Sequence, residues 1–236
     1  DVVITMLPAG RHVLSVYADI AAKVRKGALF IDSSTIDVES ARKAHAIAEA
    51  AGMQSLDAPV SGGVGGAQAA TLTFMCGGSE AAFKRAEPYL ALMGKKAVHC
   101  GDAGNGQAAK ICNNMILGIS MIGVGEAFAL AEKLGLSHQA LYDVASTSSG
   151  QCWSLTTYCP VPGPVPSSPA NNGYKPGFAA ALMLKDLRLA QEAAQATGAA
   201  TPLGAEAAQI YTLFNAQGNA DTDFSGIVNF LRGGKG

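Results

Sequence analysis

The pattern that decides the fold changes at residues 104–133, which read GNGQAAKICNNMILGISMIGVGEAFALAEK. The stretch has helical periodicity, contains no proline, and is interrupted only by small glycines. At about 1.5 Å per residue, a helix over 106–134 is more than ~40 Å long. We therefore expect one long helix here, and it begins a part of the chain in which only helices are predicted.

Before this helix, short apolar strands alternate with helices. Residues 2–6 and 28–32 are predicted as buried strands, and residues 11–26 as the helix between them. That helix is expected to carry basic residues in its last turn and to end at Gly27. The same alternation predicts helices over 38–51, capped by Asp37, and 79–93, and strands over 54–59, 71–76 and 97–100. Such alternation predicts a mostly parallel sheet with helices on both faces.

After the long helix, the pattern predicts helices over 137–146, 179–197, 202–217 and 223–231. Residues 159–177 are rich in proline, glycine, serine and asparagine and are predicted as a long ordered loop. The chain is therefore expected to contain two domains, an α/β domain over 1–102 and an all-helical domain over 103–236.

Composition excludes several classes of function. The 236 residues are 49% hydrophobic and 15% charged, which predicts a sizeable core. A net charge of −1 argues against nucleic acid as a partner. The five cysteines form no CxxC pair and the four histidines have no metal-ligand spacing, so we expect reduced thiols and no metal site. No uninterrupted run of 18 apolar residues is present, so no membrane partner is expected.

The first candidate for chemistry is the glycine-rich stretch over 57–67, which reads DAPVSGGVGGA. Glycine lets the backbone adopt positive φ and approach a ligand closely. Successive N–H groups in such a loop can hold a carboxylate. The alternative is an ordinary tight connection between two elements.

The second candidate is Lys110 with Asn114. The two residues are four apart, so they share one face of the long helix. Apolar neighbours favour the neutral form of a lysine, and a neutral amine can act as a general base. The alternative is a surface lysine beside a capping asparagine.

The same stretch contains a false match to a nucleotide-binding loop. Gly104, Gly106 and Ala109 fit the loose dinucleotide fingerprint, and Glu126 lies 20 residues after Gly106. The fingerprint requires a strand before the glycines and a second strand ending at the acid. One helical pattern runs through Glu126 instead, so we reject this interpretation.

Two further sets of residues are candidates for ligand contact. Leu7-Pro8 and Thr35 each follow a predicted strand at its carboxyl end, where ligands bind in open α/β sheets. Lys185-Asp186-Leu187 lies in a predicted helix, with Phe178 seven residues before the lysine. Simple strand termination and a solvated charged pair are the respective alternatives.

Taken together and in this order, these motifs resemble the β-hydroxyacid dehydrogenase family. The resemblance rests on 57–63, on the Gly-x-Gly-x-x-x-Lys-x-x-x-Asn pattern of 104–114 and on 185–187, and it covers essentially the whole chain. Residues 148–153 and 158–163 are most similar to members that oxidise 3-hydroxyisobutyrate to methylmalonate semialdehyde in valine breakdown. A sister reductase acting on tartronate semialdehyde and a non-catalytic scaffold remain as alternatives.

The resemblance implies a role for each matching residue. Lys110 is then the general acid/base, and Ser61, Gly62, Gly63 and Asn114 hold the substrate. NAD is the implied cofactor, with Leu7 and Pro8 as contacts, Thr35 at its nicotinamide ribose, and Phe178 and Lys185 at its nicotinamide end. His12 stands where the family often has asparagine.

The resemblance also implies partners and a location. We expect a small hydroxy-acid substrate, a homodimer or homotetramer, and a bacterial cytoplasmic enzyme, or a mitochondrial matrix enzyme if the source is eukaryotic. The chain opens on DVVITMLP, within a predicted strand, and the family's Gly-x-Gly-x-x-Gly loop lies about 60 residues before such a segment. We therefore expect an amino-terminally truncated chain, so the NAD preference is implied by the family resemblance alone.

Overall fold

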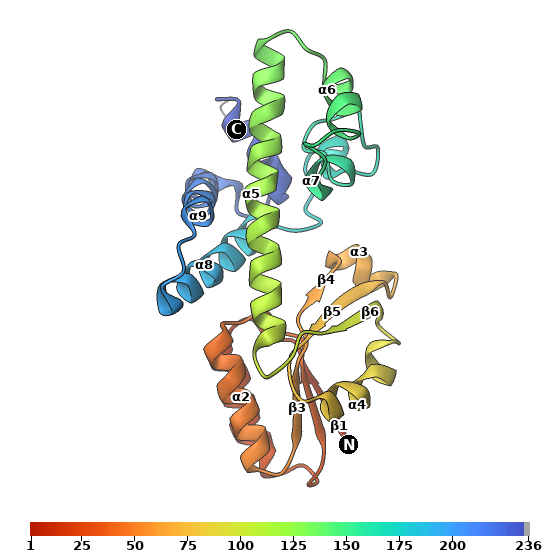
Figure 1. The fold of residues 1–236 in the computed structure, drawn as a ribbon, viewed down its shortest axis with the longest axis vertical. Helices are drawn as coiled ribbons and strands as arrows, with labels where there is room; N and C mark the ends of the chain where they lie inside the picture. The colour runs from red at the N-terminus through yellow and green to blue at the C-terminus, as the bar shows by residue number, and fades with distance from the viewer. Residues whose placement is uncertain (234–236) are drawn as a thin grey trace. The chain divides into compact units, whose positions relative to one another are not determined.

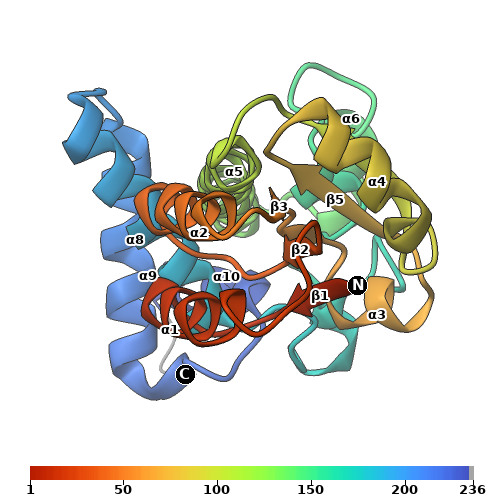
Figure 2. The same cartoon turned by 90° about the horizontal axis from the view of Figure 1, so that it is seen from below.

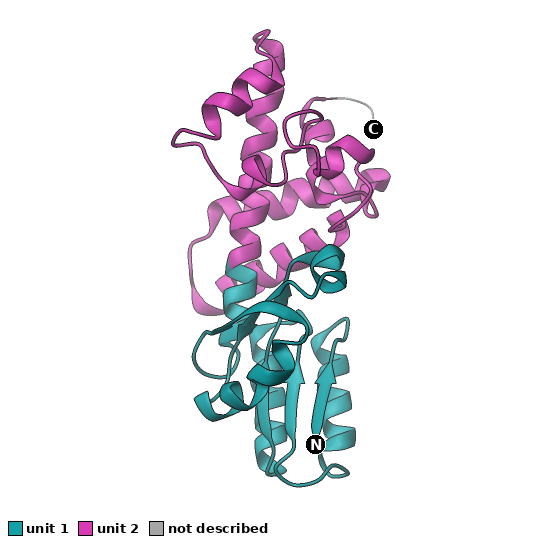
Figure 3. Ribbon diagram, turned by 90° about the vertical axis from the view of Figure 1, so that its right-hand side faces the viewer, with its two compact units in different colours: residues 1–112 teal, residues 113–236 magenta. Residues whose placement is uncertain are grey.

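The computed structural model describes residues 1–233 and consists of two compact units, Asp1–Cys112 and Asn113–Gly236 (Figure 3). Helix α5, Asn105–Lys133, begins in the first unit and continues into the second. The predicted long helix is confirmed, as is the α/β character of the first unit and the helical character of the second.

The first unit contains a parallel sheet of three strands. Strands β1 (Val2–Thr5), β2 (Leu29–Asp32) and β3 (Gln54–Asp57) are neighbours in that order. Thr5 pairs with Asp32, and Asp32 pairs with Asp57. The register therefore places three polar residues side by side where the strands end.

A second sheet of three strands follows in the same unit. It contains β4 (Val60–Ser61), β5 (Leu72–Cys76) and β6 (Gly94–His99), with β4 antiparallel to β5 and β5 parallel to β6. An isolated bridge joins Asp57 to Gly77. The expected single sheet is therefore divided. Pro59, which has no N–H to donate, follows β3, and the chain then reverses to form β4.

Helices cover both faces of the first sheet (Figure 2). Side chains of a strand point alternately to opposite faces. Phe30 therefore packs with residues of α1 (Gly10–Ala21) and α2 (Val38–Ala50), whereas Leu29 and Ile31 pack with residues of α4 (Glu80–Leu90).

The helices of the first unit agree with the sequence prediction in some features and differ from it in others. Asp37 caps α2 by accepting a hydrogen bond from the Ser40 N–H, as predicted. Helix α1 ends at Ala21, so the predicted continuation to residue 26 with a basic last turn is wrong. The stretch predicted as a glycine-rich loop contains helix α3, Gly63–Gln68. Local propensity did not reveal either feature, because glycine is permissive and lysine and arginine suit a helix well.

The regular elements in the described part of the second unit are helices and helical turns, joined by loops. Helices α8 (Ala180–Thr197) and α9 (Pro202–Phe214) lie on one side of α5, with α6 (His138–Ala145) and α7 (Trp153–Thr156) on the other (Figure 1). Helix α9 ends three residues earlier than predicted and continues as a π turn, Asn215–Asn219. The remaining elements are α10 (Ile227–Leu231) and 3₁₀ turns at Pro169–Asn172 and Phe224–Gly226.

Helix α5 has the length and composition of a membrane-spanning helix, with a mean hydropathy of 1.6 over its most apolar window. Part of this apolar character belongs to the cores of the second unit. Met121 and Ile122 belong to the core formed with α8 and α9, and Phe128 packs against Leu155 and Cys159. A core helix of a helical domain satisfies the same criteria, so length and hydropathy alone do not place α5 in a membrane.

Helix α5 begins in close contact with the sheets. An added Cβ at Gly106 would come within 2.6 Å of the Asp57 carbonyl oxygen and closer still to that of Met75. At Gly123, in the same helix, an added Cβ would meet nothing within 4 Å.

These two glycines give a matched pair of substitutions. We expect Gly106→Ala to lower the free energy of unfolding by at least ~2 kcal/mol, because backbone atoms must move to admit the methyl group. Gly123→Ala should raise it by about 0.5–1 kcal/mol, because alanine is the better helix former. Urea denaturation measures both values, and equal effects at the two positions would contradict the close approach at Gly106.

Candidate active site

The loops that follow β1 and β2 are tied together by a buried carboxylate and a serine. Asp32 Oδ1 accepts hydrogen bonds from Thr5 Oγ1 at 2.7 Å and from Ser34 Oγ at 2.6 Å. The N–H of Leu7 donates to Ser34 Oγ at 2.7 Å. The candidate cofactor residue Leu7 is thus held beside the loop that carries Thr35, and both side chains are half-buried.

Burial raises the pKa of Asp32 above its ordinary value, and the charge of Asp57 adds to the rise. Asp32 is only 2% exposed, and its Oδ2 has no hydrogen-bond partner among the described residues. Hydrogen bonds from Ser34 and Thr5 oppose the rise, but they do not cancel it.

A glutamine that sequence reasoning missed holds the backbone on both sides of Thr35. Gln107 is fully buried. Its Nε2 donates to the Ser34 carbonyl at 2.7 Å, and its Oε1 accepts from the Ile36 N–H at 3.1 Å. A polar residue three positions before Lys110 was the available signal, because residues three apart are neighbours on a helix surface.

Asp57 fixes the start of α5 to the end of β3. It is 1% exposed. Oδ1 accepts from His45 Nε2 and from the Gly104 N–H, both at 2.8 Å, and Oδ2 accepts from the Gln107 N–H at 3.0 Å. A carboxylate at a helix N-terminus satisfies free N–H groups and interacts favourably with the helix dipole. From the sequence, Asp57 was identified only as the first residue of the glycine-rich stretch, with no role predicted for its carboxylate.

Lys110 lies beside the predicted substrate loop. Its side chain is buried, with the residue 7% exposed, and Nζ donates to the Val60 carbonyl at 2.8 Å. Val60 directly precedes Ser61, Gly62 and Gly63, so residues 50 apart in sequence are brought together. Gly62 and Gly63 have φ values of 134° and 60°, which glycine adopts readily. The interpretation of Lys110 as a surface lysine is wrong.

Asn114 is held rigidly within the second unit. It is 2% exposed, its Nδ2 donates to Asp186 Oδ2, and its Oδ1 accepts from Asn113 Nδ2 at 3.0 Å. Asp186 is itself 4% exposed, so 185–187 is not a solvated charged pair. Lys185 is half-buried.

Asp223, also missed by sequence reasoning, positions Phe178. Its Oδ2 accepts from the N–H groups of Gly177 and Phe178, at 2.9 and 3.1 Å, and from Tyr158 Oη at 2.9 Å. Burial raises the pKa of Tyr158, and the Asp223 charge raises it further. The Phe178 ring contacts Phe224 edge-on, with ring centroids 5.7 Å apart. The strongly buried carboxylate therefore shapes the loop before α8.

The predicted site residues fall into two groups. Seven lie in the first unit, and Asn114, Phe178 and Lys185 lie in the second. Lys110 and Asn114 nevertheless belong to one continuous helix, in which a spacing of four places them on the same face. The first-unit residues are Leu7, Pro8, Thr35, Ser61, Gly62, Gly63 and Lys110.

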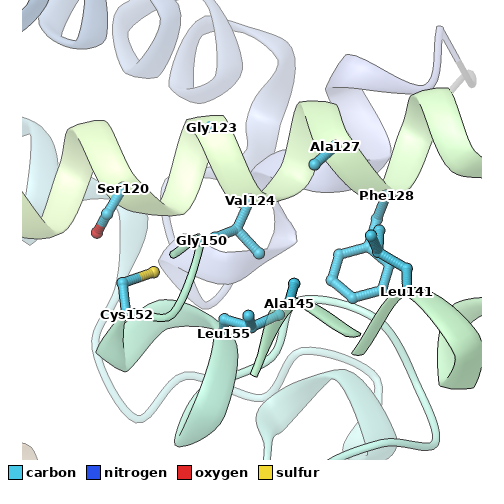
Figure 4. A pocket seen from close by; sticks show the side chains of 10 residues that line it. All are labelled: Ser120, Gly123, Val124, Ala127, Phe128, Leu141, Ala145, Gly150, Cys152 and Leu155. Atoms are coloured by element: carbon cyan, nitrogen blue, oxygen red, sulfur yellow. The ribbon is translucent and has the colours of Figure 1, made fainter. Parts of the chain in front are cut away.

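An apolar cavity of about 330 Å³ lies within the second unit (Figure 4). Ser120 and Cys152 lie at one end of it, and Phe128 and Leu141 at the other. Its lining includes none of the predicted site residues. Over residues 1–233, no group of three or more His, Cys, Asp or Glu is placed to hold a metal ion.

Comparison with known proteins places these features in context. Residues 104–231 match the family model described as NAD-binding of NADP-dependent 3-hydroxyisobutyrate dehydrogenase. Residues 1–101 match the NAD binding domain of 6-phosphogluconate dehydrogenase.

Individual relatives agree with the family models. A probable 3-hydroxyisobutyrate dehydrogenase of Mycobacterium tuberculosis is 60% identical, with 98% of this chain and 79% of the relative covered. The human mitochondrial 3-hydroxyisobutyrate dehydrogenase is 48% identical, with 98% and 70% covered. The solved Mycobacterium tuberculosis 3-hydroxyisobutyrate dehydrogenase with L-serine superposes with a TM-score of 0.95 at 59% identity, with 98% of this chain and 79% of that chain covered.

The raised pKa of Asp32 makes stability depend on pH. Since the folded state binds the proton more tightly than the unfolded state, wild-type stability falls as pH rises from the ordinary aspartate pKa through the raised one. Asp32→Asn keeps an acceptor for Thr5 and Ser34 and carries no charge.

We therefore expect the variant to gain stability relative to wild type as pH rises, by on the order of 1 kcal/mol once Asp32 is ionised. Urea denaturation at several pH values measures the difference, with the exposed Asp19→Asn as control. A difference that does not change with pH would contradict the assignment.

Proposed function

Because the chain belongs to the 3-hydroxyisobutyrate dehydrogenase family, we propose that Lys110 is the general acid/base in its NAD-dependent oxidation of 3-hydroxyisobutyrate to methylmalonate semialdehyde. The observation that carries the proposal is the buried Lys110 amine, 2.8 Å from the Val60 carbonyl oxygen and adjacent to the glycine-rich loop. The chain is an oxidoreductase, and its Rossmann-like unit and helical unit match NAD-binding family models.

The substrate carboxylate is assigned to the loop of Ser61, Gly62 and Gly63. Gly62 and Gly63 are exposed, and a backbone without side chains admits a small anion to its N–H groups. The substrate hydroxyl is assigned to Lys110, which accepts its proton during oxidation and returns it during reduction. Asn114 orients the same hydroxyl through an amide that Asp186 and Asn113 hold in place.

The residues at the carboxyl ends of β1 and β2 fit NAD. Loops at this edge of a parallel sheet are the usual dinucleotide site, and the N-terminus of α1 there has no side-chain cap. Leu7, Pro8 and Thr35 would hold the cofactor from the first unit, and Phe178 and Lys185 would hold its nicotinamide end from the second. When bound, NAD supplies the hydride acceptor.

The domain division and the assembly are part of the same proposal. Residues 1–102 act as the cofactor domain, and 103–236 as the domain for substrate contact and subunit assembly, in a homodimer or homotetramer. The location is the cytoplasm in a bacterium, or the mitochondrial matrix in a eukaryote. The name of the human relative places that protein in the mitochondrion, and the relatives from Mycobacterium tuberculosis and Pseudomonas aeruginosa come from bacteria.

Removal of the Lys110 amine tests the proposal. We expect Lys110→Ala to lower kcat by about 10²–10⁴-fold, the usual contribution of general acid–base catalysis. The exposed Lys96→Ala, on β6 of the same unit, serves as the control and should keep its kcat. A near-normal kcat for Lys110→Ala in folded protein would remove the lysine from the mechanism.

Substrate identity requires its own measurement. We expect kcat/KM for 3-hydroxyisobutyrate to exceed that for the tartronate semialdehyde couple by at least tenfold, since segments 148–153 and 158–163 resemble those of the former class of enzyme. Steady-state NADH absorbance with both substrates gives the ratio. A ratio in the opposite direction would assign the chain to the sister reductases.

A further inference from the structure

We propose that Gln107 is a positioning residue that sets the place of the Thr35 segment relative to Lys110. The inference rests on the proposed roles of Thr35 at the cofactor and Lys110 at the substrate hydroxyl. It adds a residue that touches neither ligand but fixes the spacing between the groups that do.

Both the nitrogen and the oxygen of the Gln107 carboxamide form a hydrogen bond with the backbone. Nε2 donates to the Ser34 carbonyl, and Oε1 accepts from the Ile36 N–H, so the two bonds lie on either side of Thr35. The side chain is fully buried, where an amide that loses its partners costs free energy. The Gln107 side chain therefore bonds the backbone groups on both sides of Thr35, in the way that a neighbouring β-strand bonds a strand residue.

These bonds are not needed to attach α5 to the sheet. Asp57 already holds the start of α5 through the N–H groups of Gly104 and Gln107. Helix α2, which follows Ile36, has its own cap from Asp37. The Gln107 side chain thus joins the Thr35 segment by two hydrogen bonds to the helix that carries Lys110.

The link bears on catalysis because it joins two residues with proposed roles. Thr35 contacts the cofactor that accepts the hydride, and Lys110 accepts the proton of the substrate hydroxyl. Gln107 and Lys110 are three apart and therefore neighbours on the surface of α5. A shift of the Thr35 segment relative to Gln107 is a shift relative to the Lys110 amine. Misplacement by about 1 Å can lower a rate by roughly 10²-fold.

The first test removes the link without removing volume. In the NAD-dependent reaction of the enzyme, we expect Gln107→Leu to lower kcat by ~10–100-fold and to raise KM for NAD, with a much smaller change in KM for the hydroxy acid. Gln54→Leu is the matched control. Gln54 bonds Arg85 at the start of β3, the end of the sheet opposite to the site, and its variant should keep wild-type kinetics.

The second test uses a side chain of the same shape whose donor depends on pH. A protonated Gln107→Glu side chain can donate to the Ser34 carbonyl and accept from the Ile36 N–H, whereas its carboxylate faces the carbonyl with no proton to donate. Burial raises the pKa of such a carboxyl, so the proton is lost within about pH 5–9. We expect the variant-to-wild-type ratio of kcat to fall by at least ~10-fold as pH rises, and the Gln107→Leu ratio to stay flat.

The ratio to wild type at each pH cancels the titration of neighbouring groups. Those groups are Asp32 and Asp37 on the loops beside the amide, His45 of α2, Asp57 of β3, and Lys110.

The outcomes separate the inference from the proposed function. Wild-type kcat and KM for NAD in folded Gln107→Leu, or a flat ratio for Gln107→Glu, would overturn the positioning role even if Lys110→Ala is inactive. A near-normal Lys110→Ala would overturn the proposed function by itself. If Gln107→Leu does not fold, the pH ratio of Gln107→Glu decides.

Discussion

The attachment of one helix to the end of one strand is the constraint on which the rest of the structure depends. Asp57 ends β3 and accepts hydrogen bonds from Gly104 and Gln107, where α5 begins. The contact is close enough that Gly106 has no room for a side chain. The start of α5 is therefore fixed to the sheet edge, and Lys110 lies only one turn further along.

A buried carboxylate that accepts hydrogen bonds from backbone N–H groups is found at three positions. Asp32, Asp57 and Asp223 are each at most 2% exposed, and each accepts hydrogen bonds from loop or helix N–H groups or from nearby hydroxyls. A buried charge is costly unless such donors surround it. Asp32 and Asp223 fix the backbone of loops that carry proposed ligand contacts, and Asp57 fixes the start of the helix that carries Lys110. Stability and site geometry are therefore linked at these positions.

Sequence reasoning predicted what local patterns determine. The helical periodicity of 106–134 gave α5 almost to the residue, and Asp37 was a correct cap because capping is local. The buried Asp57, Gln107 and Asp223 were missed, because their partners lie far away in sequence. The end of α1 at Ala21 and the helix within 63–68 were also missed, since packing rather than propensity decides such boundaries.

The continuity of α5 fixes the spacing of Lys110 and Asn114 along the helix, although the two residues belong to separately packed units. Each part of the helix is fixed by its own unit, at Gly106 against Asp57 and at Gly118 against Leu187. Between these points the backbone is an uninterrupted α-helix, whose rise and twist per residue are set by its hydrogen bonds. The spacing of Lys110 and Asn114 on the helix backbone is thus determined by helix geometry. Four residues of one helix set the spacing between the proposed base Lys110 and the proposed orienting amide Asn114. The packing of each unit is then left to hold that unit's own loops.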